Sequence, residues 1–541
     1  MRVTADLLVT HARPWSDGAP LAAADAVAVA GERVLAVGRA SELEALAGPR
    51  TVRLDAGGGT VTPGLCDAHI HLVAWARSLS EVALGGAATR AAALARVGAF
   101  LAAHPGDGPV VGRGWDANPW DEPPDRAALD AATGERPVLL HSRDYHALWV
   151  NSAALRAAGV TRATPDPDGG RIERDAAGEP SGVVREHAVR LFAPLEAAAG
   201  AGDDLALVRE AAGLLHRCGV TSVHDFEGPE AQRTLRALAR GGALRVLMHL
   251  PHAALDHALA TGIESGTGDD WFRIGALKLF ADGTLGSRTA ALLEPYDGTG
   301  AAGMDLLPTA ELRATVTRAL AGGLSVAFHA IGDRAVRVSL DAFEAAGEAR
   351  ARVTLPPRIE HVQLLDPADR PRFARLGVAA SMQPQHCVSD MELVRRWWGA
   401  RAERSYPWRS LLESGALLAF GSDAPVEPPR PALGLHAAVT RQRPDGTPAA
   451  GFVPSQRITL DQALDACTRG AARLAGAERL GRIAPGAAAD LVAWDVDLHA
   501  LPPARLHQAA PRWTVLAGEV VYRRGRDAAR EPAAAVREGT A

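Results

Sequence analysis

The chain has 541 residues, 47% hydrophobic and 22% charged, a composition typical of globular proteins and long enough for about three or four domains or one large barrel with additions. Its formal charge is −5, so no overall basic field favours a nucleic acid or an anionic membrane as a partner. Of the 58 basic residues, Lys278 is the only lysine; a GC-rich genome explains the shortage of lysine but not the position of this one.

The two ends of the chain share a pattern of short apolar runs. Alternating or continuous apolar residues predict strands at 5–10, 24–30 and 33–38, and near the other end at 490–495, 513–518 and 519–523. We expect these two segments, residues 1–60 and 477–541, to form one small composite β-sandwich domain. The tail after Asp527 is rich in Ala, Arg and Glu and is expected to fray.

The middle of the chain alternates between apolar strands and Ala/Leu/Arg-rich helical segments. The expected strands are at 221–226, 274–280, 324–329, 358–361, 379–383 and 417–422. At this length the alternation predicts an α/β fold, a (β/α)8 TIM-like barrel over residues 61–476. The interval from His71 to Lys278 is too long for three strand–helix units, so we expect an insertion at about 105–205, where Gly, Pro and Trp are frequent.

Cysteine usage and the N-terminus bear on the compartment. The four cysteines are spread over four hundred residues without a CxxC pair, which disfavours both a disulfide framework and a thiolate zinc site. The chain begins in alternating apolar residues, without the apolar core of a signal peptide. No apolar run reaches the eighteen or so residues of a membrane helix. We expect a soluble, cytoplasmic protein.

The segment Leu65–Leu72 contains a His-x-His motif. On a strand, residues two apart face the same side, so His69 and His71 point together while Ile70 faces away. Two imidazoles that converge from one strand can supply two metal ligands, although this motif alone is a weak signal.

Four further residues lie at or near the ends of expected strands, namely Lys278, His329, His361 and Asp423. In a (β/α)8 barrel these ends share one face, where active sites are built. Histidine and carboxylate together suit zinc or another first-row divalent ion. Each histidine alone is better explained as a core or surface residue, because the chain has 18. The ordered set is a much stronger signal than its parts.

The chain resembles the amidohydrolase superfamily of metal-dependent hydrolases, and within it the N-substituted formamide deformylase-like (YtcJ-like) branch. The matching segments are 61–71 (VTPGLCDAHIH), 114–116 (GWD), 146–155 (HALWVNSAAL), 219–225 (GVTSVHD), 277–290 (LKLFADGTLGSRTA), 329–333 (HAIGD), 359–361 (IEH), 381–386 (SMQPQH), 421–426 (GSDAPV) and 481–491 (GRIAPGAAADL). They occur in order over almost the whole chain, so the match is specific. One departure is Asp144-Tyr145-His146, where such proteins often carry Asp-Gly-His.

The resemblance implies a metal site and a mechanism. His69, His71 and Asp423 would bind one divalent ion, and His329 and His361 a second. Lys278, carboxylated by CO₂, would bridge the two ions, a role that the strongly basic guanidinium of arginine cannot fill. The ions, expected to be zinc, would activate a shared water as hydroxide, and Asp423 would accept its proton and pass it to the leaving amine. A site with one ion and an unmodified Lys278 is the alternative.

Five further residues are candidates for substrate binding: Arg288, His146, His224, Trp115 and His386. Arg288 lies in the loop after Lys278 and suits a substrate carboxylate or carbonyl, with an ordinary surface arginine as the alternative. The histidines suit the pocket wall or a layer behind it, and core packing is the alternative for Trp115.

These observations favour a metal-dependent amidohydrolase that hydrolyses a C–N bond of amide, N-acyl or N-formyl type. A deaminase, or a hydrolase of lactones or cyclic amides, on the same scaffold is the enzymatic alternative, because barrel ligands do not decide the substrate. A non-catalytic binding or assembly protein is disfavoured, since all six expected ligands are present. We expect a small-molecule substrate, no nucleic-acid or membrane partner, and either a monomer or a homodimer.

Overall fold

The structure is a computed structural model that describes residues 3–199 and 203–525. These residues form two compact units. The first unit contains residues 3–72, 208–285 and 290–525, and the second contains 73–199, 203–207 and 286–289. The tail that we predicted after Asp527 lies outside the described residues.

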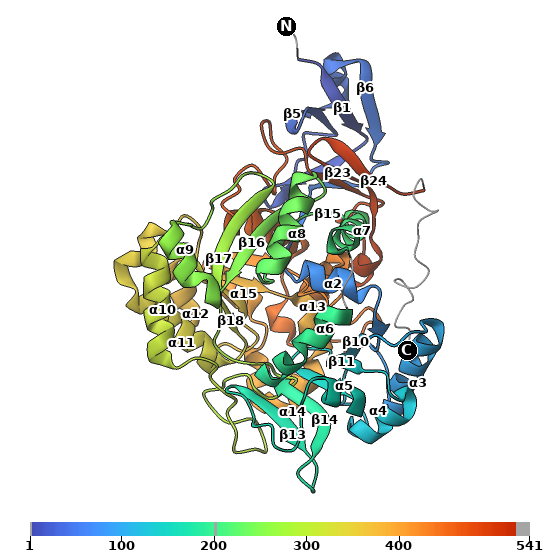
Figure 1. The fold of residues 1–541 in the computed structure, drawn as a ribbon. Helices are drawn as coiled ribbons and strands as arrows, with labels where there is room; N and C mark the ends of the chain where they lie inside the picture. Colours follow the sequence, from blue (N-terminus) through green and yellow to red (C-terminus); the bar gives the residue numbers. More distant parts are fainter. Residues whose placement is uncertain (1–2, 200–202, 526–541) are drawn as a thin grey trace. The chain divides into compact units, whose positions relative to one another are not determined.

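The first unit contains a sheet of eight parallel strands that curves into a barrel (Figure 1). In spatial order the strands are β8 (Leu65–Ile70), β15 (Val220–Asp225), β16 (Arg245–Pro251), β17 (Phe272–Phe280), β18 (Val326–Ala330), β19 (Arg358–His361), β20 (Ala379–Met382) and β21 (Leu418–Phe420). A parallel bridge between Ile70 and Ala424 joins the two ends of the sheet. The (β/α)8 barrel is therefore confirmed, and the expected strands match within two residues, except that β16 was not predicted.

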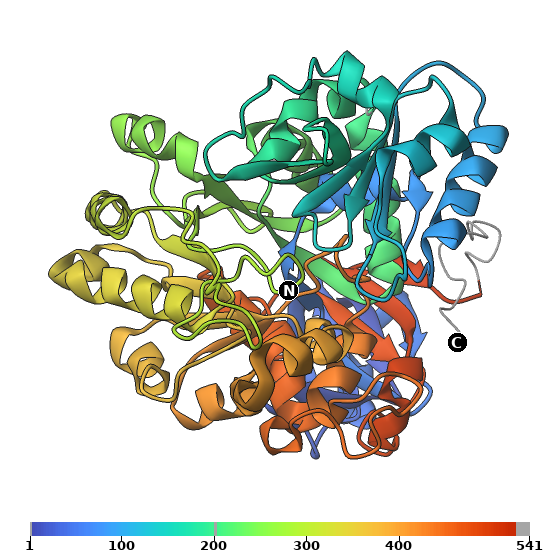
Figure 2. The same cartoon turned by 90° about the horizontal axis from the view of Figure 1, so that it is seen from below.

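Helices follow the strands of the barrel. They are α8 (Pro229–Arg240), α9 (Leu255–Thr261), α10 (Thr309–Ala321), α11 (Asp333–Ala345), α12 (Arg370–Leu376), α13 (Pro384–Ser389), α14 (Met391–Trp398), α15 (Trp408–Glu413), α16 (Pro431–Thr440), α17 (Leu460–Asp465) and α18 (Ala471–Leu474). Helix α8 shows why such a segment is helical: Pro229 opens it, where no N–H is needed, and its buried residues include Leu235 and Leu238. Figure 2 shows the helices following one another in sequence order around the outside of the strands, from green to orange.

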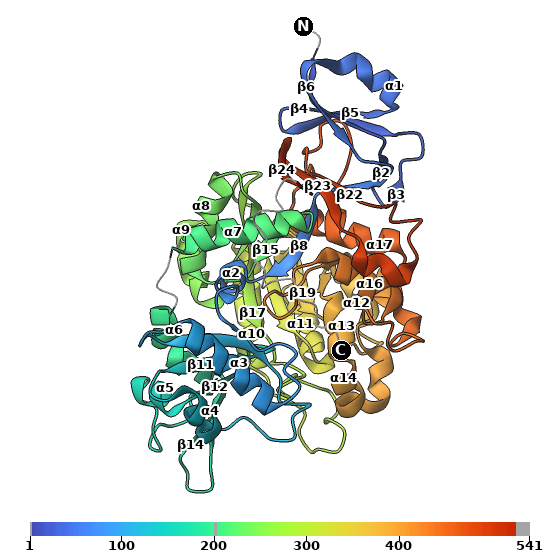
Figure 3. The same cartoon turned by 90° about the vertical axis from the view of Figure 1, so that its right-hand side faces the viewer.

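The two ends of the chain together form a β-sandwich in the first unit. One sheet has the order β5 (Arg33–Gly38), β4 (Ala26–Ala30), β1 (Ala5–Thr10), β6 (Ala47–Asp55), with helix α1 (Ala40–Leu43) between β5 and β6 in the sequence. The other has the order β24 (Glu519–Arg523), β23 (Pro511–Leu516), β22 (Leu491–Trp494), β7 (Thr60–Pro63), β2 (Arg13–Ser16), β3 (Ala19–Pro20). Red C-terminal strands thus lie beside blue N-terminal ones (Figure 3).

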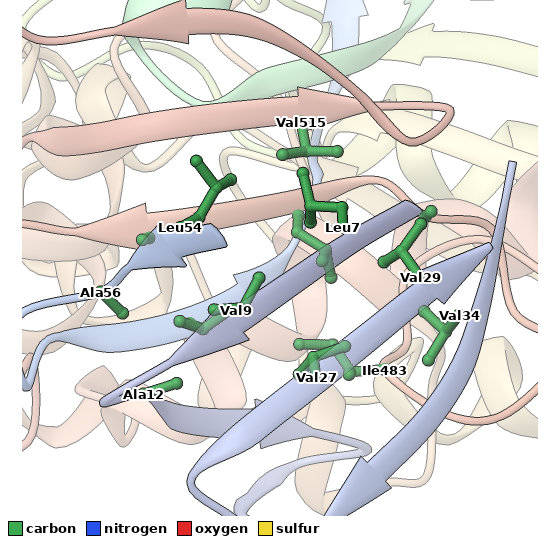
Figure 4. Close-up of a cluster of buried hydrophobic side chains, with 14 of the residues drawn as sticks. Leu7, Val9, Ala12, Val27, Val29, Val34, Leu54, Ala56, Ile483 and Val515 are labelled. Carbon is green, nitrogen blue, oxygen red and sulfur yellow. The ribbon is translucent and has the colours of Figure 1, made fainter. Parts of the chain in front are cut away.

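A shared apolar core holds the sandwich together. Leu7, Val9 and Val29 of the first sheet pack with Ile483 and Val515 from the C-terminal segment (Figure 4). Because both segments contribute to one core, neither sheet buries its inner face alone. The composite sandwich predicted from the two termini is confirmed.

The second unit is built on a mixed sheet with the order β13 (Gly170–Arg174), β14 (Pro180–Glu186), β12 (Ala147–Val150), β11 (Val138–Ser142), β10 (Val110–Trp115), β9 (Val82–Ala83). Its helices are α3 (Arg90–Ala103), α4 (Arg126–Thr133), α5 (Ser152–Ala157) and α6 (Ala193–Ala199), and α2 (Leu72–Ser78) and α7 (Asp204–Arg217) carry the chain between the two units. The side chains of Thr89, Asp125 and Asn151 cap three of these helices. The insertion expected at about 105–205 falls within this unit, which begins earlier, at Val73.

Within residues 3–199 and 203–525, no helix combines the length and the apolar character needed to cross a membrane.

Candidate active site

Three of the expected metal ligands meet where the barrel closes. His69 lies near the end of β8, His71 follows that strand, and Asp423 follows β21. The N–H of Asp423 donates to the carbonyl of His69 at 2.7 Å, and the N–H of His71 donates to that of Ala424 at 2.9 Å. These bonds fix the three side chains relative to one another at the carboxyl ends of the strands, the face on which barrel enzymes carry their chemistry.

The first donor group comprises His69, His71 and Asp423. The Nε2 atoms of His69 and His71 lie 3.5 and 3.4 Å from Oδ1 of Asp423, and one ligand atom of each residue lies within 4.8 Å of the others. Burial lowers the pKa of His69 well below its ordinary value, so this imidazole is neutral, as a ligand must be. The pKa of Asp423 is also lowered: burial acts to raise it, but the neighbouring histidines outweigh that effect.

A second donor group lies on the other oxygen of the same carboxylate. Nδ1 of His361 and Nε2 of His386 lie 4.0 and 3.8 Å from Oδ2 of Asp423, again within 4.8 Å of one another. His386 was a candidate for substrate binding, and the structure places it in a candidate metal-ligand group with His361 and Asp423. Two sets of imidazole and carboxylate ligands that share Asp423 fit one or two first-row divalent ions.

Lys278 lies inside the barrel, only 4% exposed. Its Nζ is 4.5 Å from the ring centroid of Phe226 and 5.0 Å from that of Phe280. Burial lowers the pKa of Lys278 to about 8, because the ammonium form loses its hydration. The only lysine of the chain is therefore held as a partly neutral amine.

His329 belongs to neither donor group. Its ring centroid lies 4.5 Å from that of His361, but its Nε2 lies 3.1 Å from the carbonyl oxygen of Gly283 and 3.7 Å from a carboxylate oxygen of Asp282. The structure thus places His329 beside the metal-ligand candidates without aiming Nε2 at Asp423. Its role as a ligand stays a prediction.

The backbone at the site is under strain. His361 and Asp423 have φ values of 77° and 61°, in the left-handed region that non-glycine residues rarely occupy. Gly421 is required for a different reason, because a Cβ atom there would lie 2.3 Å from the backbone nitrogen of His69. Strain of this kind persists where the surrounding structure fixes a functional geometry.

Two charged residues beneath the site were not predicted as functional, Arg358 and Glu360. Both are buried, and Glu360 contacts Nδ1 of His69 at 2.6 Å. The sequence did contain an indication of this role. Arg358 and Glu360 are two residues apart in the short buried strand β19, so they face the same side, and buried charges need a partner. His224, a candidate for substrate binding, belongs to the same layer: its Nδ1 lies 3.0 Å from Nη1 of Arg358.

The other substrate-binding candidates lie in the second unit. Trp115 is buried there with Trp120 and Trp149, and its indole N–H donates to the carbonyl of Leu140, so it packs in a core. Nδ1 of His146 lies 2.7 Å from a carboxylate oxygen of Glu186. Arg288 has a φ of 57° and is exposed. Substrate binding by these three residues stays a prediction.

Tyr145 occupies the position at which similar proteins often carry glycine. Its φ is 61°, a conformation that glycine adopts without a steric penalty. The hydroxyl of Tyr145 accepts a hydrogen bond from Nη1 of Arg113 at 3.0 Å, and Arg113 in turn pairs with Glu81. A glycine at this position has no side chain and could not accept this hydrogen bond from Arg113.

The chain is similar to known amidohydrolases over most of its length. A model of the amidohydrolase family matches residues 53–522. The chain is 33% identical to YtcJ of Bacillus subtilis (strain 168) over 493 residues, which cover 88% of this chain and 91% of that one. It is 30% identical to the N-substituted formamide deformylase of Arthrobacter pascens over 520 residues, 91% of this chain and 94% of that one. The crystal structure of a metal-dependent hydrolase from Pyrococcus horikoshii superposes with a TM-score of 0.74 at 28% identity, covering 92% of this chain and 99% of that one.

Proposed function

The chain belongs to the amidohydrolase family of metal-dependent hydrolases, and from this premise we propose that it cleaves the C–N bond of a small amide of N-acyl or N-formyl type. The observation that carries the proposal is the group of His69, His71 and Asp423 at the carboxyl face of the barrel, in which His69 and Asp423 are buried and His71 is half-buried. Similarity to an N-substituted formamide deformylase supports the choice of bond.

We propose zinc as the metal, in one or two ions. His69, His71 and Asp423 would hold the first, and Lys278, His329 and His361 would hold the second, with His386 in reach of the same carboxylate. A divalent ion bound there would lower the pKa of a coordinated water toward neutrality and polarise the substrate carbonyl.

Asp423 is the proposed base. Its lowered pKa keeps the carboxylate ionised at neutral pH, and its two oxygens face the two donor groups. It would accept a proton from the attacking water and deliver that proton to the nitrogen of the leaving amine as the C–N bond breaks. The water adds its oxygen to the carbonyl carbon, so a carboxylic acid and an amine result.

The surroundings of Lys278 suit carboxylation. At pH 7 an amine with a pKa of about 8 is neutral in about one molecule in ten, against about one in three thousand for an ordinary lysine. The neutral amine is the form that attacks CO₂, and the product is a carbamate anion plus a proton. That anion would bridge two ions, which an ammonium group cannot do.

We propose that the enzyme acts in the cytoplasm. The four cysteines are free thiols, which suits the reducing cytoplasm. The partner would be a small molecule, and the assembly a monomer or a homodimer.

The test is a substrate screen with zinc-loaded protein. N-formyl amines, N-acyl amino acids, cyclic amides, lactones and aminopurines are offered in parallel, and release of amine, acid or ammonia is measured. Faster turnover of N-formyl or N-acyl amines supports the proposal. Turnover confined to lactones or to deamination substrates would overturn the assignment of the bond and leave the metal site standing.

A further inference from the structure

The ring of His69 is held on two sides. Its Nδ1 lies 2.6 Å from Oε2 of Glu360, and its face stacks on Phe226 with ring centroids 4.0 Å apart. Phe226 in turn stacks on His249 at 4.0 Å, with an interplanar angle of 7°. Both His69 and Glu360 are buried, at 1% and 0% exposure, so water does not compete for the hydrogen bond between them.

This contact determines which ring nitrogen carries the proton. An ionised carboxylate can only accept hydrogen bonds, and a neutral imidazole has a single N–H. Nδ1 of His69 must therefore be the donor to Glu360, and the lone pair remains on Nε2. That nitrogen is the one that faces Oδ1 of Asp423.

Glu360 is itself held by Arg358. Nε of Arg358 donates to Oε1 of Glu360, and Nη2 donates to Oε2 at 3.1 Å. The guanidinium has three further partners, the carbonyl of Ala68 at 2.7 Å, Oγ of Ser381 at 2.7 Å and Nδ1 of His224 at 3.0 Å. These partners lie on β8, β20 and β15, so Arg358 joins its own strand β19 to three others.

The arrangement is a chain of contacts that ends at the metal-ligand nitrogen. His224 accepts from Arg358, Arg358 donates to Glu360, and Glu360 accepts from His69. Arg358 only donates in these hydrogen bonds and Glu360 only accepts, so their directions are mutually consistent. An ion pair that only stabilised the core would not need to contact Nδ1 of His69 in particular.

We propose that Glu360 and Arg358 are positioning residues for the metal, with Glu360 fixing the tautomer and orientation of His69 and Arg358 fixing Glu360. The inference rests on the proposed function, since it requires a divalent ion at His69. It also gives His224 a role, because a histidine that anchors Arg358 acts through the layer beneath the site and does not contact the substrate. Carboxylates behind ligand histidines raise metal affinity, and their removal costs about 10- to 100-fold.

The experiment measures metal affinity, which needs no substrate. The dissociation constant for Zn²⁺ is measured by competition with a chelator in the wild type, Glu360→Gln, Glu360→Asp and Ser381→Ala, each checked for its folded fraction. Glu360→Gln removes the charge at nearly constant size. Glu360→Asp keeps the charge toward Arg358 but is one methylene too short to reach Arg358 and His69 together, and it serves where Glu360→Gln does not fold.

Ser381→Ala is the matched control. It removes one hydrogen bond from Arg358 and leaves the contact between Glu360 and His69 in place. We expect Glu360→Gln and Glu360→Asp to weaken Zn²⁺ binding by about 10- to 100-fold, and Ser381→Ala to stay within about three-fold of the wild type. The visible spectrum of the Co²⁺-loaded protein should shift in the Glu360 variants alone, because it reports the ligand geometry.

Two results would overturn the inference: wild-type affinity in a folded Glu360 variant, or an equal loss in Ser381→Ala, which would mean that general loosening of the barrel is responsible. A wild-type protein that binds no divalent ion would overturn the proposed function and this inference with it. The two failures are thus distinguishable.

Discussion

Lys278→Met should stabilise the metal-free, CO₂-free protein at neutral pH. The amine of Lys278 is buried against Phe226 and Phe280, and its pKa falls from 10.5 to about 8. In that range the unfolded chain binds a proton that the folded chain does not. This lysine therefore destabilises the folded state fully below about pH 8, and the penalty fades as the pH rises toward 10.5. Methionine has a similar length and no charge to desolvate.

The size of the effect follows from the shift. About 2.5 pKa units at about 1.36 kcal/mol each give about 3 kcal/mol at pH 7. The advantage of Lys278→Met should fall to about 2 kcal/mol at pH 9 and to less than about 0.5 kcal/mol at pH 10.5, where the unfolded lysine loses its proton too. Differences in packing of the methionine add a part that does not vary with pH.

Urea unfolding of the barrel, followed at pH 7, 9 and 10.5, measures this difference, provided that both proteins unfold with the same m value. Lys278→Arg is the control, because its guanidinium stays charged at every pH tested and should give no stabilisation at pH 7. A Lys278→Met protein that is less stable than the wild type at pH 7, or whose advantage does not change with pH, would show that burial of the charged amine does not destabilise the folded chain.

Three other substitutions separate the roles of individual residues. Trp115→Ala should lower the stability of the second unit by about 3–5 kcal/mol without changing zinc content; unchanged thermal unfolding would contradict its place in the core. Asp423→Asn should reduce turnover about 100-fold or more while metal analysis finds most of the zinc retained, and equal losses of both would make it a ligand only. His386→Gln should weaken binding of a second equivalent of Zn²⁺ but not of the first, as followed by titration; two unchanged equivalents would remove His386 from the ligand set.

Much of the fold could be predicted from periodicity. The strands β1, β5, β19 and β24 were predicted with their observed ends. For β1 and β5 the reason is that an apolar run leaves little freedom in where a strand stops. The composite sandwich followed from the same pattern at both ends. Strand β16 was missed, although its residues are almost all buried.

The candidate site was predictable only in part. Candidate ligand residues could be brought together because they lie at or after strand ends, and parallel strands bring their carboxyl ends to one face. The contact between Glu360 and His69 could not be found, since it joins residues 291 apart through the closure of the barrel. Nor does the sequence reveal that His361 and Asp423 take left-handed backbone conformations, or that His386 shares a carboxylate with His361.

The metal content of the purified protein, measured beside that of His69→Asn, tests the proposed metal site. We predict one to two equivalents of a divalent ion per chain in the wild type, and loss of at least one equivalent together with the hydrolytic activity in His69→Asn. A wild-type protein that is active after complete removal of metal would show that the hydrolysis does not depend on a metal ion at His69, His71 and Asp423.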